Sequence, residues 1–175
     1  MEMSVDLGIL MIRVLFGVAI AAHGAQKLFG WFGGYGLKGT GGVFETLGFR
    51  PGIAFAAAAA LSEFGGGVLL TLGLFTPAGA SAILAAMLVA IVSVHLKNGF
   101  FAMGNGVELP FLYAAVALGV AFTGAGAYSL DARLGPTPLS EPRIVAGILV
   151  LAIIGAAVTL GLRRQAQDQT SAARH

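Results

Sequence analysis

Long apolar segments dominate this chain of 175 residues. A helix needs about 20 mostly apolar residues to cross the hydrocarbon core of a bilayer. Five segments approach that length, at residues 7–29, 52–75, 78–94, 109–127 and 144–162. A membrane barrel would instead show alternating segments of about ten residues, and these are absent from the sequence. The pattern therefore predicts an all-α membrane protein, a compact helical bundle with little outside the bilayer.

Composition agrees with a lipid bilayer as the surroundings and excludes several functions. The chain is 57% hydrophobic and 10% charged, and its net charge is only +2. It has no basic cluster with interleaved aromatic residues, so we expect no nucleic-acid partner. It also has no cysteine, which excludes thiol relays within this subunit. Any electrons must therefore travel on a bound cofactor or on another protein.

Glu63 is the only charged residue in the second apolar segment. A carboxylate near the middle of such a segment costs several kcal/mol unless it is protonated or paired. Small residues flank Glu63 on its helical face and allow a neighbouring helix to approach closely. They are Ala56, Ala59, Ala60, Gly66 and Gly67. We expect Glu63 to point into the bundle and to mark a functional site.

The first segment carries Arg13, Phe16, Ile20, His23 and Lys27 at spacings of 3, 4, 3 and 4 residues. This spacing places all five on one stripe that faces a partner helix. No basic residue precedes Arg13, so we expect a retained first helix and no cleaved signal.

Polar residues from four helices converge on one half of the predicted bundle. They are His23, Gln26 and Lys27 from the first helix, Glu63 from the second, His95 and Asn98 from the third, and Glu108 from the fourth. We assign catalytic roles to Glu63, His23 and His95, and binding roles to Lys27, Gln26, Trp31, Asn98 and Glu108. Each has a simpler alternative. Residues at helix ends can be interfacial, Lys27 can reach the headgroups, and Glu63 could be a structural partner of Lys27 or of a histidine.

Glu63 and the polar residues of the first helix are expected at different depths in the membrane. At 1.5 Å per residue, Glu63 lies roughly 7 Å deeper than His23. A direct ion pair with His23 or Lys27 then needs a tilted helix, a long lysine reach or a bridging water. We therefore expect Glu63 to be mostly protonated and to donate a hydrogen bond. Arg13 lies in the opposite half, where we expect a structural ion pair with Asp131.

Metal and haem are less favoured than a quinone. His23, His95 and Glu63 could form a facial metal site, and the two histidines could bind haem, but no supporting motif is present. A quinone needs only an apolar slot, hydrogen-bond donors for its two oxygens and a titratable group. The glycine-rich connection at 30–51, which we expect to lack regular structure, could cover such a slot as a lid. Its Trp31, Phe32 and Tyr35 equally suit a headgroup anchor.

The remaining connections set the topology. A tight turn at Thr76 and Pro77 should join the second and third helices as a hairpin, and the prolines of 128–142 suggest a stiff connector.

With five crossings, one side of the membrane holds seven basic residues and the other side holds three, which predicts a cytoplasmic C-terminus. The seven are Lys27, Lys38, Arg50, Lys97, Arg163, Arg164 and Arg174. Beyond Leu162 we expect a disordered polar tail.

Several motifs in order resemble the DoxX family. They are RVLFGVAIAAHGAQKLFGWFGG from Arg13, GLKGTGGVFETLGFRPG from Gly36, LSEFGGGVLLTLGLFTP from Leu61, VHLKNGFF from Val94, and GVELPFLYAAVALGVAFTGAGAYSLDARLG from Gly106. The resemblance implies a four-helix transmembrane core at 1–135, a connector and additional fifth C-terminal transmembrane helix at 136–162, and a tail at 163–175. The fifth helix departs from the family's four-helix pattern and makes a simple transfer of topology unsafe.

The resemblance also implies a bacterial inner-membrane protein related to a subunit of thiosulfate:quinone oxidoreductase. Family members are linked to oxidative and thiol stress. The family pattern falls on Arg13, His23, Gly24, Lys27, Leu28, Phe29, Gly30, Glu63, Gly66, His95, Gly99, Phe100 and Asp131. The function that follows is a quinone-linked oxidoreductase subunit supplied with electrons by a soluble redox partner or a small thiol donor. The alternatives are a scaffold for redox enzymes and a proton-coupled transporter, and homo-oligomerisation stays open.

Overall fold

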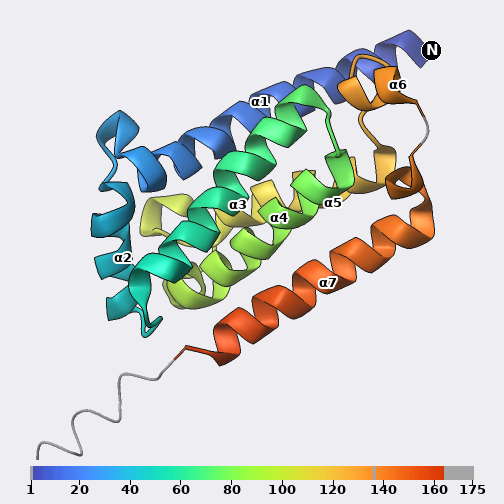
Figure 1. Cartoon of the computed structure of the whole chain (residues 1–175). Coiled ribbons are helices and arrows are strands. Elements are labelled where there is room, and N and C mark those ends of the chain that lie inside the picture. Colours follow the sequence, from blue (N-terminus) through green and yellow to red (C-terminus); the bar gives the residue numbers. More distant parts are fainter. Residues whose placement is uncertain (1, 136, 164–175) are drawn as a thin grey trace, which may run out of the picture.

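A computed structural model describes residues 2–135 and 137–163, and this part of the chain is helical without strands (Figure 1). The five long helices are α1 (Glu2–Phe29), α3 (Gly52–Leu72), α4 (Thr76–Ala90), α5 (Glu108–Thr123) and α7 (Pro142–Gly161). The short ones are η1 (Trp31–Gly33), α2 (Gly36–Thr46), the π-helical turn η2 (Ile91–His95), η3 (Leu96–Asn98), η4 (Ala102–Gly104), α6 (Leu130–Leu134) and η5 (Pro138–Ser140). The predicted all-α membrane architecture is confirmed.

Among the described residues, four helical spans are long and apolar enough to cross a membrane. They are Met3–Phe29, Gly52–Leu72, Thr76–Asn98 and Pro142–Gly161. The predicted span at 109–127 is shorter than expected, because α5 has 16 residues and ends at Thr123. Its length of roughly 24 Å is less than the hydrocarbon thickness of about 30 Å. The helix ends there because Gly124 and Gly126 adopt positive φ angles, which do not continue a right-handed helix.

Helices α1 and α3 pack in direct backbone contact along their lengths. A Cβ atom on Gly24 would lie 2.3 Å from the backbone nitrogen of Phe64, and one on Gly67 would lie 2.6 Å from the nitrogen of Ala21. Side chains at these positions would force the helices apart, so glycine is needed for the close approach. The predicted role of the small residues beside Glu63 is confirmed for Gly67.

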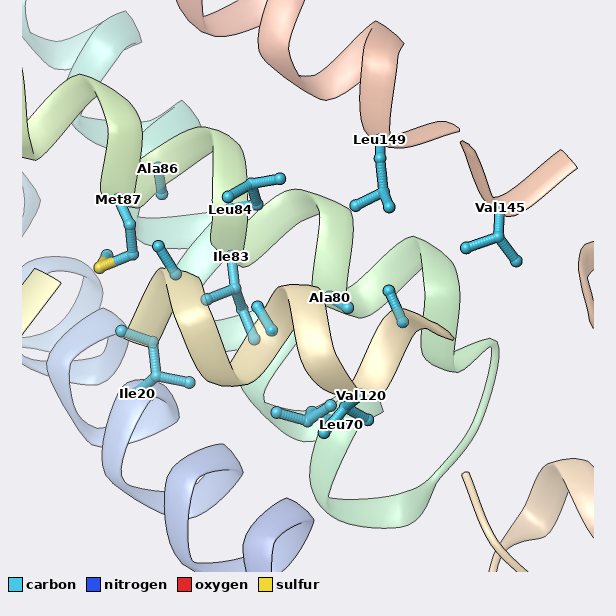
Figure 2. Packing of buried hydrophobic residues seen from close by; sticks show 13 residues of the cluster. Ile20, Leu70, Ala80, Ile83, Leu84, Ala86, Met87, Val120, Val145 and Leu149 are labelled. Carbon is cyan, nitrogen blue, oxygen red and sulfur yellow. The ribbon is translucent and has the colours of Figure 1, made fainter. Parts of the chain in front are cut away.

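Helix α4 lies at the centre of the bundle and packs against α3, α5 and α7. Figure 2 shows its buried side chains surrounded by those of four other helices. The cluster includes Ile20, Leu70, Ala80, Ile83, Leu84, Ala86, Met87, Val120, Val145 and Leu149. Of the polar residues at the end of α4, Ser93 is buried in the bundle, and His95 and Asn98 are half-buried.

The predicted hairpin between α3 and α4 is confirmed, and α6 closes it. Both carboxylate oxygens of Asp131 accept backbone hydrogen bonds at the start of α4, from Phe75 N at 2.8 Å and Thr76 N at 3.0 Å. These bonds satisfy backbone donors that a helix start leaves free.

Arg13 is fully buried in the same region. Its guanidinium donates to the carbonyls of Leu70, Thr71 and Tyr128 at 3.1, 3.0 and 2.7 Å. Arg13 and Asp131 therefore form their hydrogen bonds with backbone groups, and the predicted ion pair is reduced to an electrostatic attraction between the two side chains. The last carbonyls of α3 are the reason, since a helix C-terminus leaves its acceptors free and carries partial negative charge.

The glycine-rich connection after α1 is not the unstructured loop expected from the sequence. It contains η1 and the eleven-residue helix α2. Thr40 and Gly41 of α2 are buried, and α2 packs against α3. The aromatic ring of Phe49, which is fully buried, lies 5.6 Å from Phe44 and 5.2 Å from Phe55. Packing thus stabilises a helix that its glycine content disfavours.

The two ends of the bundle are distinct (Figure 1). Arg163, just beyond α7, donates to the carbonyl of Leu47 at 2.5 Å, so α7 ends beside α2. We call this the α2 end and the opposite one, where α1 begins and α6 lies, the α6 end. The predicted stiff connector at 128–142 contains α6 and η5. The predicted disordered tail from residue 164 onward lies outside the described residues, and the predicted domain limits stay predictions.

Candidate functional site

Lys27 and Glu63 form a buried ion pair between α1 and α3. The ammonium of Lys27 donates to both carboxylate oxygens of Glu63. Glu63 is 2% exposed, whereas the side chain of Lys27 is 32% exposed. Glu63 is therefore paired directly with Lys27, the partner that the structural alternative named. The long lysine stem covers the difference in depth, and the close approach of α1 and α3 shortens the lateral distance.

The first cavity beside this pair, called here the histidine cavity, has a volume of about 140 Å³. Both members of the pair, two histidines, a tyrosine and five apolar residues line it. They are Lys27, Glu63, His23, His95, Tyr113, Ile20, Met87, Ala90, Leu109 and Pro110. All four helices that were expected to contribute polar groups therefore do so here, but α5 contributes Tyr113 and not the predicted Glu108.

Tyr113 is the site residue that the sequence reasoning missed. Its ring meets the His23 imidazole edge to face, with centroids 5.9 Å apart, and meets Phe16 in the same way at 5.8 Å. The available signal was a phenol in an apolar segment, one helical turn beyond the start of α5. A phenol and an imidazole in one cavity supply two hydrogen-bonding groups that can exchange protons.

The second cavity, called here the α2 cavity, has a volume of about 350 Å³ and is covered by α2. Its lining includes Gln26, Tyr35, Thr40, Val43, Phe44 and Leu47 near or on α2, and Ala59, Ala86, Val89, Ser93 and Val94 on α3 and the α4 end. Lys27, Glu63, Ala90 and His95 line both cavities. The ion pair therefore lies on the wall that the two cavities share.

His95 ends the π-helical turn η2, which extends α4. Its Nδ1 lies 2.8 Å from the carbonyl oxygen of Asn105. A carbonyl only accepts, so Nδ1 carries the proton and Nε2 is the nitrogen left to bind or release one. Asn98 donates to the same carbonyl at 3.1 Å. The loop after α4 thus fixes the orientation of the imidazole.

The other predicted binding residues lie outside the shared wall. Gln26 lines the α2 cavity and donates to the carbonyl of Phe32 at 3.2 Å. Trp31 is 56% exposed and stacks on Phe29 at the α2 end. Glu108 accepts a hydrogen bond from Ala102 N at 2.8 Å. Trp31, Asn98 and Glu108 are not among the lining residues of the two cavities, and their contacts hold loops in place.

The comparisons with known proteins agree with the sequence motifs. The DoxX family model matches residues 8–96. This region covers most of α1 and all of α2, α3 and α4, and it contains His23, Lys27, Glu63 and His95. The chain belongs to the DoxX family.

This DoxX protein has two similar relatives among curated proteins. One, from Bacillus subtilis (strain 168), bears the name "Putative oxidoreductase CatD". It is 32% identical over 131 residues, which cover 75% of this chain and 90% of the relative. The other, from Haemophilus influenzae (strain ATCC 51907 / DSM 11121 / KW20 / Rd), bears the name "Uncharacterized protein". It is 32% identical over 123 residues, or 69% of this chain and 85% of the relative. No solved structure matches the chain.

The site of this DoxX protein suits proton exchange with a small molecule. Within the part of the chain that the structure describes, no three histidines or carboxylates are placed to hold a metal ion. The groups gathered are instead an ammonium donor, a carboxylate acceptor, two imidazoles and a phenol. In surroundings of low polarity such groups interact strongly with a bound polar atom. The arrangement can therefore bind a carbonyl oxygen and transfer protons to it.

Proposed function

We propose that this DoxX protein is a quinone-binding subunit of a membrane oxidoreductase in the bacterial inner membrane. The observation that carries the proposal is the Lys27–Glu63 pair on the wall between two cavities. The α2 cavity, at about 350 Å³, lies in the size range of small-molecule sites, roughly 300–1,000 Å³. Polar and apolar residues both line the cavities, but most of the exposed lining surface is apolar, as a quinone ring requires.

The residues divide the chemistry between them. Reduction of a quinone to a quinol takes two electrons and two protons. Lys27 is the donor that would bind one quinone oxygen, because its ammonium is already held inside the bundle by Glu63. His23 and Tyr113 face the histidine cavity as further donors, and His95 offers Nε2 for proton exchange. Glu63 would accept and return protons as the charge on the substrate changes.

The electrons must come from outside this chain, because it contains no cysteine. A small thiol donor satisfies the balance: two thiols form one disulfide and release two electrons and two protons, which convert one quinone to one quinol. A soluble redox partner would supply the same two electrons. The name of the Bacillus subtilis relative supports an oxidoreductase.

Two other functions make different predictions. A scaffold for soluble enzymes needs no polar groups inside the bundle. A transporter needs a route through both halves of the membrane, whereas both cavities are lined from the halves of α1 and α4 nearest the α2 end. The geometry therefore favours a binding and proton-exchange site over either alternative.

The test is quinone binding by the purified protein in lipid nanodiscs, together with quinone reduction in membranes supplied with thiol. We expect quinone in organic extracts, and we expect Glu63→Gln and His23→Ala to lower reduction at least about tenfold, the scale of lost proton transfer. Glu141→Gln is the control, because Glu141 is exposed at the α6 end. Failure of the wild-type protein to bind quinone in any lipid would overturn the proposal.

A further inference from the structure

A third cavity lies between α7 and the helices that form the site. It has a volume of about 250 Å³ and is lined by residues of α2, α3, α4 and α7. They are Phe44, Ala54, Phe55, Ala58, Ala59, Ser62, Ala85, Ala86, Val89, Gly155, Ala156 and Thr159. The lining contains no charged residue, so this cavity, called here the α7 groove, suits an apolar ligand.

Small residues make up much of the lining of the groove. In the first half of α7, Val145 and Leu149 are buried against the core cluster (Figure 2). In the second half, Ala156 is buried, whereas Gly155 is exposed and lines open space. A Cβ atom on Gly155 would have no atom within 4 Å. Gly67 is the opposite case, since its missing side chain admits the backbone of α1.

The polar atom of Thr159 is already used within its own helix. Its hydroxyl donates to the carbonyl of Gly155 at 2.8 Å. The groove therefore offers few hydrogen-bonding groups, and a polar substrate would lose its hydration there without compensation. A hydrocarbon chain has no such cost.

The α7 groove lies next to the site and shares lining residues with it. Phe44, Ala59, Ala86 and Val89 line both the groove and the α2 cavity. The α2 cavity in turn shares the Lys27–Glu63 wall with the histidine cavity. The three cavities thus form a series that is charged at one end and apolar at the other. Such a series matches a molecule with a polar head group and a long apolar tail.

We infer that the α7 groove binds the isoprenoid tail of the quinone, so that the protein selects long-tailed quinones over their head groups alone. This inference rests on the proposed function, because the head group must lie against Lys27 and Glu63. Helix α7 lies outside the matched region 8–96. Selection by tail length is therefore a property that this chain adds to the DoxX core through Gly155, Ala156 and Thr159.

The experiment compares a benzoquinone head group alone with the same head group carrying a long isoprenoid tail. Binding to nanodisc-embedded protein is measured for the wild type, for Gly155→Leu and for Ala58→Leu, which fills the groove from α3. Gly147→Leu is the matched control: Gly147 is exposed on the same helix, and its Cβ would also meet nothing within 4 Å. Because all proteins are measured in the same lipid, the partition of the tail into the bilayer contributes equally to every binding measurement and drops out of the comparison.

We expect Gly155→Leu and Ala58→Leu to weaken binding of the tailed quinone roughly tenfold, as exclusion of apolar groups from a pocket does. Binding of the head group alone should stay within about twofold of the wild type, and Gly147→Leu should change neither. A tailed quinone with a photoreactive diazirine at the tail end should label 54–62 or 155–159, as read by peptide mass spectrometry.

Two outcomes would overturn the inference while leaving the proposed function intact. In one, both groove variants bind tailed quinone as tightly as the wild type. In the other, the photoreactive tail labels residues outside 54–62 and 155–159. Loss of a co-purified phospholipid from the groove variants, with quinone binding unchanged, belongs to the first outcome. Failure of both the head group and the tailed quinone to bind the wild type would overturn the proposed function as well.

Discussion

The ammonium of Lys27 contacts both carboxylate oxygens of Glu63 on the wall that separates the histidine cavity from the α2 cavity. The two residues are not equally enclosed: Glu63 is 2% exposed and the side chain of Lys27 is 32% exposed. Because of this difference in exposure, the charge left without a partner is buried when Lys27 is replaced and partly exposed when Glu63 is replaced.

Lys27→Met should destabilise the protein more than Glu63→Gln does. Loss of the lysine leaves a buried carboxylate without a partner, at a cost of about 3 kcal/mol, whereas loss of the carboxylate leaves an ammonium that can reach the headgroups, at about 1 kcal/mol. Denaturant unfolding in one lipid composition measures both, and the double variant should recover part of the Lys27→Met loss. The prediction would be contradicted if the two single variants lost equal stability and the double variant lost the sum of those two losses.

Glu63→Gln should insert and fold yet lose quinone reduction, because glutamine preserves the shape of glutamate but does not exchange protons. The measurement is quinone reduction in membranes, divided by the amount of folded protein. Full activity of Glu63→Gln combined with unfolding of Glu63→Ala would make the carboxylate a structural group and not a catalytic one.

His95→Phe and Asn98→Ala should have different effects, although both side chains bind the carbonyl of Asn105. Each substitution removes one hydrogen bond that holds the loop at 99–107, a loss of about 1 kcal/mol. Both should therefore speed amide hydrogen exchange in that loop. Only His95 lines the cavities, so only His95→Phe should also weaken quinone binding. Equal binding losses would mean that His95 acts through the loop alone.

Arg13→Lys should destabilise the α6 end despite keeping the charge. The guanidinium donates hydrogen bonds to the carbonyls of Leu70, Thr71 and Tyr128. A lysine ammonium does not reproduce the planar arrangement of donors in a guanidinium. We expect a loss of about 2–3 kcal/mol, because two of the three carbonyl acceptors lose a charged donor. The control is Arg133→Lys, since Arg133 is exposed on α6. Equal stability of the two variants would show that only the charge of Arg13 matters.

Gly67→Ala and Gly65→Ala should change stability in opposite directions. A methyl group on Gly67 would lie 2.6 Å from the backbone of α1, whereas one on Gly65 would have no atom within 4 Å. Overpacking should cost Gly67→Ala about 1–3 kcal/mol. Gly65→Ala should be neutral or stabilising by up to about 1 kcal/mol, since alanine favours the helix. Thermal unfolding of both proteins measures the difference, and similar shifts would contradict the close α1–α3 contact.

The C-terminus should lie in the cytoplasm. Lys27, Lys38, Arg50, Lys97 and Arg163 belong to the α2 end or its loops, and Arg133 and Arg143 to the α6 end. The positive-inside rule then places the α2 end inside the cell. Reporters fused after Leu162 measure the side, with a cytoplasmic and a periplasmic reporter compared in parallel. Activity of the periplasmic reporter alone would reverse the orientation.

The sequence by itself determined the class of the protein and four polar residues of the site. Hydropathy over about 20 residues is a local property, so it indicated the apolar helices without knowledge of their packing. Helical spacing likewise brought His23 and Lys27 onto one stripe, and the lone carboxylate of Glu63 had to face protein. These three residues and His95 all line the histidine cavity.

Only the tertiary structure decided which of these groups touch. The Lys27–Glu63 pair depends on the distance between α1 and α3, which two glycines set by admitting backbone contact. Helix α2 forms because it packs on α3, although its glycines disfavour a helix. Tyr113 enters the site, and the α7 groove stays open, through the relative placement of separate helices. Distances between helices depend on how side chains from distant parts of the chain fill the space, and no local pattern carries that information.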